Sequence, residues 1–213
     1  MPPSGTGHQR LPADERRRQL IETAIDLFSR KGFSGTTTKE IAAAAGVNEA
    51  IVFRHFATKK DLYTAIIEHR LGDGLEQWYQ SAQAFMDKKD DEGLFRMLVT
   101  EIIRAYRENP RFERLMMFAA LEGQELAVIN NQMAQPVKQQ LIDYIARRQR
   151  AGAIRKGDAM AIMLAAVGSA KFYATQKYLF DTCWPVSDES AIDTFIQVLM
   201  AGIKGPRANG GKK

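Results

Sequence analysis

The chain has 213 residues, of which 45% are hydrophobic and 26% are charged. These proportions are typical of a folded globular protein and exclude the collagen-like, disordered and disulfide-scaffold classes. The single cysteine, Cys183, permits no internal disulfide bond and no cysteine-cluster metal site. We therefore expect neither a metal ion nor a cofactor.

The sequence carries no signal for insertion into a membrane or passage across one. The longest uncharged run of its second half, residues 159–170, is shorter than the ~20 apolar residues that span a bilayer. The N-terminal part lacks the order of a secretion signal, in which basic residues precede an apolar run. We expect a cytoplasmic protein with no membrane partner.

Charge is distributed unevenly along the chain. Residues 1–60 carry 10 Lys and Arg against 6 Asp and Glu, whereas residues 61–204 carry 17 against 19. A basic N-terminal part on a slightly acidic remainder indicates contact with a polyanion such as DNA. The alternative, a basic face that is only solvated, stays open on charge alone.

The first predicted elements are a disordered arm and a helix. Residues 1–12 are rich in Pro, Gly and Ser, and they lack periodicity. Apolar residues then recur at helical spacing, which predicts a helix from an N-cap at Asp14 to Gly32. Arg10 and the arginines at 16–18 form a basic arm that can enter a minor groove. The alternative is a charged helix start that only adds solubility.

Two short helices follow, separated by a glycine turn. Thr37 and Glu40 have the spacing of a capping box, which predicts a helix over residues 39–45. Gly46 ends this helix, and Asn48 is a good N-cap for a second short helix through Phe56. Short helices are not stable alone in water, so both must pack on their neighbours. The arrangement predicts a helix-turn-helix, whose second helix usually lies in the major groove of DNA.

The remainder of the chain is also predicted to be helical. Thr58 caps a long fourth helix, and Pro136 suits the first turn of a later one. No stretch alternates between apolar and polar residues for long enough to form a strand, so we expect an all-α fold of about nine helices. After the fourth helix, the predicted helices lie at 94–106, 112–121, 136–151, 158–180 and 187–203.

The order of residues between Arg18 and Tyr63 resembles the sequence pattern of a known protein family. The residues that carry the resemblance are Ile21, Ala24, Leu27, Phe28, Gly32, Phe33, Thr37, Thr38, Ile41, Ala42, Ala45, Gly46, Val47, Phe56, Lys59 and Leu62. In this spacing they resemble the DNA-binding head of the TetR (tetracycline-repressor-like) family of bacterial regulators. About 45 residues are covered, and beyond them only the helical layout and the length are similar.

The resemblance implies a division of the chain into four parts. Residues 1–12 are the disordered basic arm, and residues 13–57 are the helix-turn-helix DNA-binding head. Residues 58–204 are expected to form a helical body that binds an effector and dimerises. Residues 205–213, rich in Gly and Lys, are expected to be a flexible tail.

The candidate DNA-binding residues lie on the two short helices and at the start of the fourth. The free N–H groups at the start of a helix bind phosphate, and a lysine such as Lys39 can reach a guanine edge. Glu49 can accept from a cytosine amine, and Ala50 or Ile51 can contact a thymine methyl. The candidates are Thr37, Thr38, Lys39, Asn48, Glu49, Ala50, Ile51, Phe53, Arg54, His55 and Lys59.

Several of these candidates have alternative interpretations or depart from the family pattern. The threonines at 37–38 can act only as caps, and His55 can be a half-buried structural residue. Lys59 lies in the first turn of a helix, where positive charge is unfavourable, and a phosphate would offset that cost. The family commonly has tyrosine where this chain has Phe53, so the phenolic hydroxyl is lost, and Arg54 can supply the missing phosphate contact.

The body is expected to hold an effector and a dimer interface. The helix at 158–180 is apolar nearly all round at its start, so it must be covered on two sides. The residues expected at the dimer interface are Met163, Val167, Ala170, Phe195 and Leu199. The residues expected to line an apolar effector pocket are Trp78, Leu98, Ile102, Tyr106, Leu115, Met116, Phe118, Phe172 and Tyr173. Glu101 and Glu122 are candidate polar contacts of the effector or, alternatively, surface residues.

These features predict a homodimeric DNA-binding repressor. It would leave a palindromic double-stranded operator when a small apolar or amphipathic molecule binds the body. The main alternative is an architectural DNA-binding protein with little sequence preference. We expect no enzyme, because no motif assembles a nucleophile with a base, and a helical bundle that only binds proteins would not need the capped, basic head.

Overall fold

The computed structural model describes residues 11–204, and the side chains of residues 71–76, 124–127, 130, 131 and 133 lie outside that description. Within residues 11–204 the fold is all-α, as predicted, with an isolated β-bridge and no strand. The helices are α1 (Ala13–Lys31), α2 (Thr38–Ala44), α3 (Glu49–His55), α4 (Lys59–Asp87), α5 (Asp91–Glu108), α6 (Pro110–Glu122), α7 (Gln124–Arg150), α8 (Ala159–Ala174), the π-helical segment η1 (Thr175–Leu179) and α9 (Asp188–Ile203).

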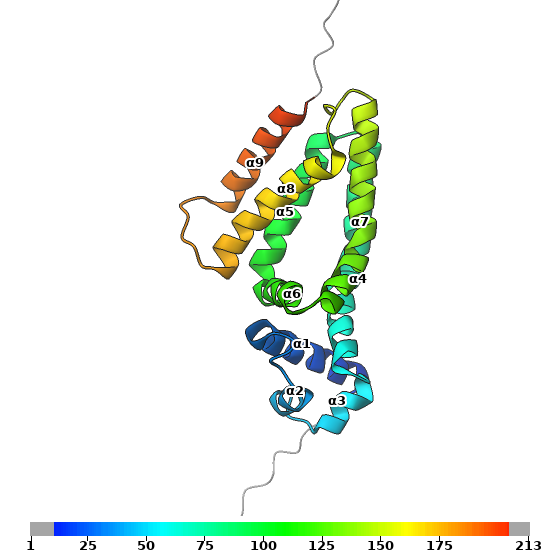
Figure 1. Ribbon diagram of the computed structural model, residues 1–213, viewed down its shortest axis with the longest axis vertical. Coiled ribbons are helices and arrows are strands. Elements are labelled where there is room, and N and C mark those ends of the chain that lie inside the picture. The colour runs from blue at the N-terminus through cyan, green and yellow to red at the C-terminus, as the bar shows by residue number, and fades with distance from the viewer. Residues whose placement is uncertain (1–10, 205–213) are drawn as a thin grey trace, which may run out of the picture.

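The helices form a small head and a larger body. Helices α1, α2 and α3 lie together at one end of the molecule, and α4 runs from this head into the body (Figure 1). In the body, α5 packs against α8 and α9, and α8 and α9 lie side by side (Figure 1). None of the helices described is long and apolar enough to cross a membrane.

The predicted N-caps of the two short helices are confirmed. The Thr37 side chain accepts from the backbone of Glu40 in a complete capping box, and Asn48 caps α3 by accepting from Ile51 N–H. Between the two helices Gly46 has a φ of +68°, the left-handed conformation that glycine adopts without steric cost. The predicted N-cap at Asp14 is wrong: α1 begins at Ala13, after Pro12, with no side-chain cap.

The hydrophobic core of the head extends beyond its own three helices. Apolar residues of α1, α2 and α3 are joined in this core by Leu62 to Ile67 of α4. Three residues of α6 complete the same core, namely Phe112, Leu115 and Ala119. The buried residues therefore do not divide at residue 57, because α4 and α6 belong to the head core as well as to the body.

A second core fills the body. It joins α4, α5, α7, α8 and α9 through buried residues that include Phe95, Tyr144, Met163 and Ile196. One ion pair lies at its edge: the Arg148 guanidinium donates to Asp91 with Nε to Oδ1 at 2.8 Å and Nη2 to Oδ2 at 2.9 Å. This two-point contact fixes the end of α7 against the start of α5.

Two helix boundaries of the body differ from the predictions. Pro136 lies inside α7 rather than in a first turn, because this helix begins at Gln124. A proline inside a helix removes one backbone hydrogen bond, and the length of α7 and its packing against α6 and α8 outweigh that loss. The helix predicted over 158–180 is α-helical to Ala174 and then continues as η1. The predicted arm and tail lie outside the described residues except for Leu11 and Pro12.

Candidate nucleic-acid interface and effector cavity

The eleven predicted DNA-binding residues gather at the free end of the head. None of them is fully buried, which a contact surface requires. The exposed ones are Thr37, Lys39, Asn48, Ala50, Phe53 and Arg54. The half-buried ones are Thr38, Glu49, Ile51, His55 and Lys59.

Helix α3 has one buried and one exposed side. Val52 belongs to the head core, whereas Phe53 is 48% exposed although it is large and apolar. The exposed position of the Phe53 ring leaves it free to contact a partner molecule. Arg54, next to it, is exposed and places positive charge on the same side of the helix.

A side-chain hydrogen bond connects the two helices of the helix-turn-helix. The Thr38 hydroxyl donates to the Glu49 carboxylate, and so joins the first residue of α2 to the first residue of α3. Both side chains were predicted to contact DNA directly. In the free protein they contact each other, which fixes the relative position of α2 and α3.

The start of α2 carries an acid whose charge is neutralised within the protein. Hydrogen bonds from Lys31 and from the backbone and hydroxyl of Thr37 lower the pKa of Glu40 to about 2. The Lys31 ammonium lies 2.7 Å from the Glu40 carboxylate. Glu40 is thus ionised at neutral pH, and the paired lysine keeps this acid from repelling a phosphate at the start of α2.

His55 is half-buried, as in the alternative interpretation. Among the described residues its Nε2 atom is buried and has no hydrogen-bond partner. Burial lowers the pKa of His55, and the charges of Arg54, Arg17 and Arg16 lower it further. The imidazole is therefore neutral at pH 7 and brings no positive charge to a phosphate.

Lys59 is held by the loop between α1 and α2. Its Nζ donates to the carbonyl oxygens of Phe33 and Thr36, both at 2.8 Å, and lies 4.2 Å from the centroid of the Phe33 ring. These two carbonyls offset the unfavourable position of the lysine at a helix start, so a phosphate is not needed for that. A lysine ammonium has three N–H donors, and these bonds leave capacity for one more acceptor.

Basic residues border a hollow beside α3. This hollow has a volume of about 770 Å³ and lies between the start of α1 and α3. Arg16 and Arg54 line it together with Asn48 and Ile51. Arg17 instead covers the Phe56 ring, with its guanidinium carbon 5.0 Å from the ring centroid. The basic arm thus contributes positive charge at the edge of α3, while Arg10 lies outside the described residues.

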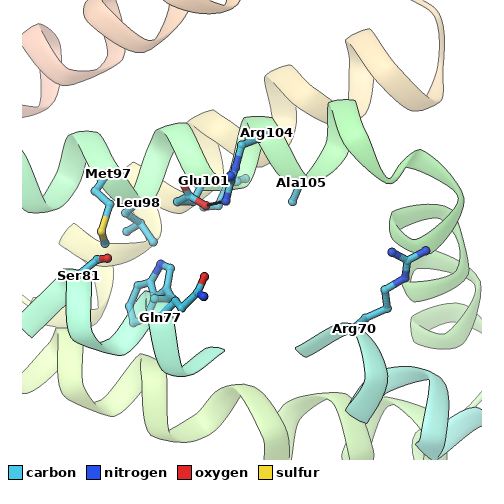
Figure 2. Close-up of a pocket in the computed structure, with 10 residues that line it drawn as sticks. Arg70, Gln77, Ser81, Met97, Leu98, Glu101, Arg104 and Ala105 are labelled. Atoms are coloured by element: carbon cyan, nitrogen blue, oxygen red, sulfur yellow. Dashed lines mark hydrogen bonds and ion pairs between the residues drawn. The ribbon is translucent and has the colours of Figure 1, made fainter. Parts of the chain in front are cut away.

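The body contains a cavity of about 450 Å³ between α4 and α5, which is in the range of small-molecule sites. Figure 2 shows Arg70 at one end of this cavity and Ser81 and Met97 at the other. Four of the residues predicted to contact the effector line this cavity, namely Trp78, Leu98, Glu101 and Ile102. Six further residues line the cavity that were not predicted from the sequence: Arg70, Gln77, Ser81, Met97, Arg104 and Ala105.

The missed residues of α5 follow a signal that the sequence contains. Met97 and Ala105 lie one helical turn on either side of Glu101, a predicted polar contact of the effector. Extending the candidates on this helix by one turn in each direction would have found them. For Arg70 and Gln77 the sequence holds no comparable signal, because they reach the cavity through the orientation of α4.

The other predicted pocket residues do not line this cavity. Leu115 and Met116 pack in the head core, because α6 packs against α1. Tyr173 is buried in the body, and its hydroxyl donates to Asp188. The remaining three do not line the cavity either: Tyr106 is buried, Phe118 is half-buried and Phe172 is exposed.

The two predicted polar contacts have different positions. Glu101 lines the cavity and forms an ion pair with Arg104. Glu122 does not reach the cavity, because its carboxylate accepts hydrogen bonds from Phe33 N–H and Ser34 N–H of the head. Glu122 is therefore bound to the head and does not line this cavity.

An arginine, Arg70, lies at one end of the cavity. Arg70 Nη1 donates to Asn109 Oδ1 at 3.0 Å, and Nη2 lies 3.4 Å from Glu22 Oε2. Its Nε atom is buried and has no partner among the described residues. Arg70 thus contacts α1, the junction of α5 with α6, and the cavity.

The exposed apolar face of the body differs from the predicted dimer interface. Met163 and Ala170 are buried in the body core, and Val167, Phe195 and Leu199 pack against it. Met163 and Ala170 thus do not reach the surface of the isolated chain, whereas Val167, Phe195 and Leu199 are half-buried. The exposed apolar residues of α8 and α9 include Met160, Leu164, Phe172 and Val198.

Comparison with known proteins identifies the family of the chain. Residues 20–66 match the profile of bacterial regulatory proteins of the tetR family. Residues 92–203, more than half of the chain, match the profile of the tetracyclin repressor-like C-terminal domain.

The curated relatives are transcriptional regulators. The chain is 32% identical over 38% of its length to the HTH-type transcriptional activator FasR of Mycolicibacterium smegmatis, of which the match covers 36%. It is 27% identical over 52% of its length to the repressor NicS of Pseudomonas putida, of which the match covers 51%. The matches thus span about half or less of the length of these relatives.

Solved structures share the fold over most of the chain. The regulator FadR from Bacillus subtilis, in complex with stearoyl-CoA, has a TM-score of 0.70 and 16% identity, covering 87% of this chain and 98% of that one. AibR, in complex with isovaleryl coenzyme A and operator DNA, has a TM-score of 0.62 and 19% identity, covering 87% and 98%. Together with the two profile matches, these findings show that the chain belongs to the tetracycline-repressor-like (TetR) family of bacterial transcriptional regulators.

Proposed function

We propose that the protein is a cytoplasmic repressor that binds a palindromic operator as a homodimer and leaves it when an effector binds the body. The observation that carries this proposal is the exposed face of α3, where Phe53 and Arg54 lie beside the capped start of α2. In this proposal residues 13–57 are the DNA-binding unit and residues 58–204 are the effector-binding and dimerisation unit. The role is regulatory, not catalytic.

The outer face of α8 and α9 supports the dimer. Leu164 is 54% exposed and Val198 is 69% exposed, and they lie on adjacent helices. Ala165 and Gly168 are exposed on the same helix as Leu164 and let a second helix approach closely. Two copies joined here as a four-helix bundle would place two α3 helices on one duplex, about 34–36 Å apart or a multiple of the helical turn.

The experiment that tests DNA recognition is selection of duplexes from a random pool by the purified protein near physiological salt. We expect enrichment of an inverted repeat, because a symmetric dimer reads two equal half-sites. Binding without enrichment would favour an architectural DNA-binding protein, whose affinity comes from phosphate contacts. Absence of binding would contradict the proposal.

The proposed effector is an amphipathic anion of the fatty-acyl type. The cavity has an apolar wall that includes Trp78, Leu98 and Ile102, and its two ends differ because Arg70 lies at one of them (Figure 2). Two proteins of the same fold were solved with acyl-CoA molecules. An apolar chain along the wall and a negative group at Arg70 would match these features.

We expect decanoate to bind more tightly than 1-decanol in isothermal titration calorimetry, because only decanoate can pair with Arg70. Arg70→Met should weaken decanoate binding about tenfold, since hydrogen bonds to a charged group contribute about 1.5–3 kcal/mol. The same change should leave 1-decanol unaffected, whereas Trp78→Ala should weaken both ligands. Equal binding of the two ligands, or binding of neither, would contradict an anionic fatty-acyl effector.

A further inference from the structure

The loop between α1 and α2 is held from two sides. On one side the Glu122 carboxylate, at the end of α6, accepts from Phe33 N–H at 2.6 Å and from Ser34 N–H at 3.2 Å. On the other side Lys59, at the start of α4, donates to the carbonyls of Phe33 and Thr36. The N–H groups of the loop thus donate to an acceptor on α6, and its carbonyl groups accept from a donor on α4, the helix that connects the head with the body.

The glycine at the start of this loop makes room for the carboxylate. Gly32 is buried, with a φ of +74°. A Cβ atom at Gly32 would lie 1.9 Å from Glu122 Oε1, which is far inside contact distance. Glycine is therefore needed here twice, for its backbone conformation and for the close approach of Glu122.

The position of the loop determines the position of the DNA-binding helices. The Thr36 hydroxyl is buried and donates to Gly32 O at 2.9 Å, which closes the loop immediately before Thr37, the N-cap of α2. The hydrogen bond from Thr38 to Glu49 then joins α2 to α3. A displacement of the loop is therefore transmitted to both short helices.

Helix α6 can carry a change in the body to this loop. It packs on α1 through Phe112, Leu115 and Ala119, and it also contacts α5, α7 and η1. Glu122 is the last residue of this helix. A shift of α6 along its axis would pull the carboxylate away from the two N–H groups.

We propose that Glu122 is a positioning residue that acts as a clasp between body and head. It holds the α1–α2 loop so that α2 and α3 take the orientation that binds DNA, and its release lowers DNA affinity. The inference rests on the proposed DNA-binding function. It goes further by naming the residue through which a change in the body alters the position of the DNA-binding helices.

The test compares Glu122→Ala, Glu122→Gln and the control Leu121→Ala. Leu121 precedes Glu122 on α6 and is 83% exposed. We expect Glu122→Ala to weaken binding to the duplex selected by the wild type about tenfold, within the range of allosteric coupling. Glu122→Gln should restore part of the affinity, because its amide oxygen still accepts a hydrogen bond, and Leu121→Ala should bind as the wild type does.

Hydrogen exchange provides a readout that does not depend on DNA. In Glu122→Ala the amides of Phe33 and Ser34 should exchange faster, while the amides of the body core stay protected. Faster exchange with unchanged DNA affinity would overturn the clasp, because the contact would then exist without positioning the helices. Unchanged exchange would overturn it as well. If the wild type itself selects and binds no duplex, the proposed function fails, and the exchange result still decides whether the contact exists.

Discussion

Replacement of Asp91 by alanine is expected to lower the free energy of unfolding by about 3 kcal/mol. Asp91 and Arg148 are only 11% and 16% exposed, so the change leaves a guanidinium without its counter-ion in a poorly solvated place. The Tyr144 hydroxyl, which donates to Asp91 Oδ1 at 2.6 Å, loses its acceptor as well. Burial and the hydrogen bond to Asp91 raise the pKa of Tyr144, so it remains a donor over the range in which the protein is folded.

The measurement is urea unfolding followed by circular dichroism at one protein concentration, because the stability of a dimer, the state proposed above, depends on concentration. The matched control is Asp193→Ala, which removes the partner of Arg96 in an exposed ion pair. Exposed pairs contribute less than about 1 kcal/mol, so the control should unfold nearly as the wild type does. Equal effects of the two substitutions would show that the Asp91 pair is solvated like a surface pair.

Replacement of Phe28 by alanine should destabilise the protein by about 3–5 kcal/mol, the usual cost of deleting a buried aromatic ring. Phe28 is 1% exposed, and its ring lies 5.5 Å from that of Phe33 and 6.4 Å from that of Tyr63. These three rings fill the space under the α1–α2 loop. We expect DNA binding to be lost together with the fold of the head, measured by urea unfolding and by binding to the selected duplex.

Phe53→Ala is the matched comparison because it removes the same ring from the surface. Its effect on unfolding should stay within about 0.5 kcal/mol, as for most surface changes. Its affinity for the selected duplex should fall about tenfold, or about 1.4 kcal/mol, because the exposed ring loses its apolar contact with the DNA. A loss of stability as large as that of Phe28→Ala would place Phe53 in the core, and unchanged affinity would remove it from the interface.

The head could be predicted from the sequence because its signals are local. Thr37 with Glu40, and Asn48 with the N–H three residues later, are caps whose partners lie within one turn. Gly46 needs a left-handed conformation that few other residues adopt. The predicted start of α1 was wrong. Aspartate is a residue type that often caps helices, which favoured Asp14, but the helix begins one residue earlier, at Ala13.

The site residues of the body were predicted less well because their positions depend on distant partners. Apolar spacing showed that Leu115 would be buried, but not that α6 packs on α1. On α8 both Met163 and Leu164 are apolar, and periodicity cannot choose between them when nearly every position is apolar or small. Tertiary packing buries Met163 and leaves Leu164 exposed. The contact of Glu122 with a loop 88 and 89 residues away has no sequence signal.

The completion of the head core by α6 has a consequence for engineering. Phe112, Leu115 and Ala119 lie 45, 48 and 52 residues beyond Ile67, the last residue that α4 gives to that core. A fragment cut after Ile67 would expose the apolar surface that these three side chains cover. A chimeric regulator that combines this DNA-binding head with the body of another protein must therefore retain α6. Otherwise it must replace α6 with a helix whose surface fits the head core. The same requirement applies when segments are exchanged between related proteins. Helices α1 and α6 then have to come from the same protein, because they pack against each other.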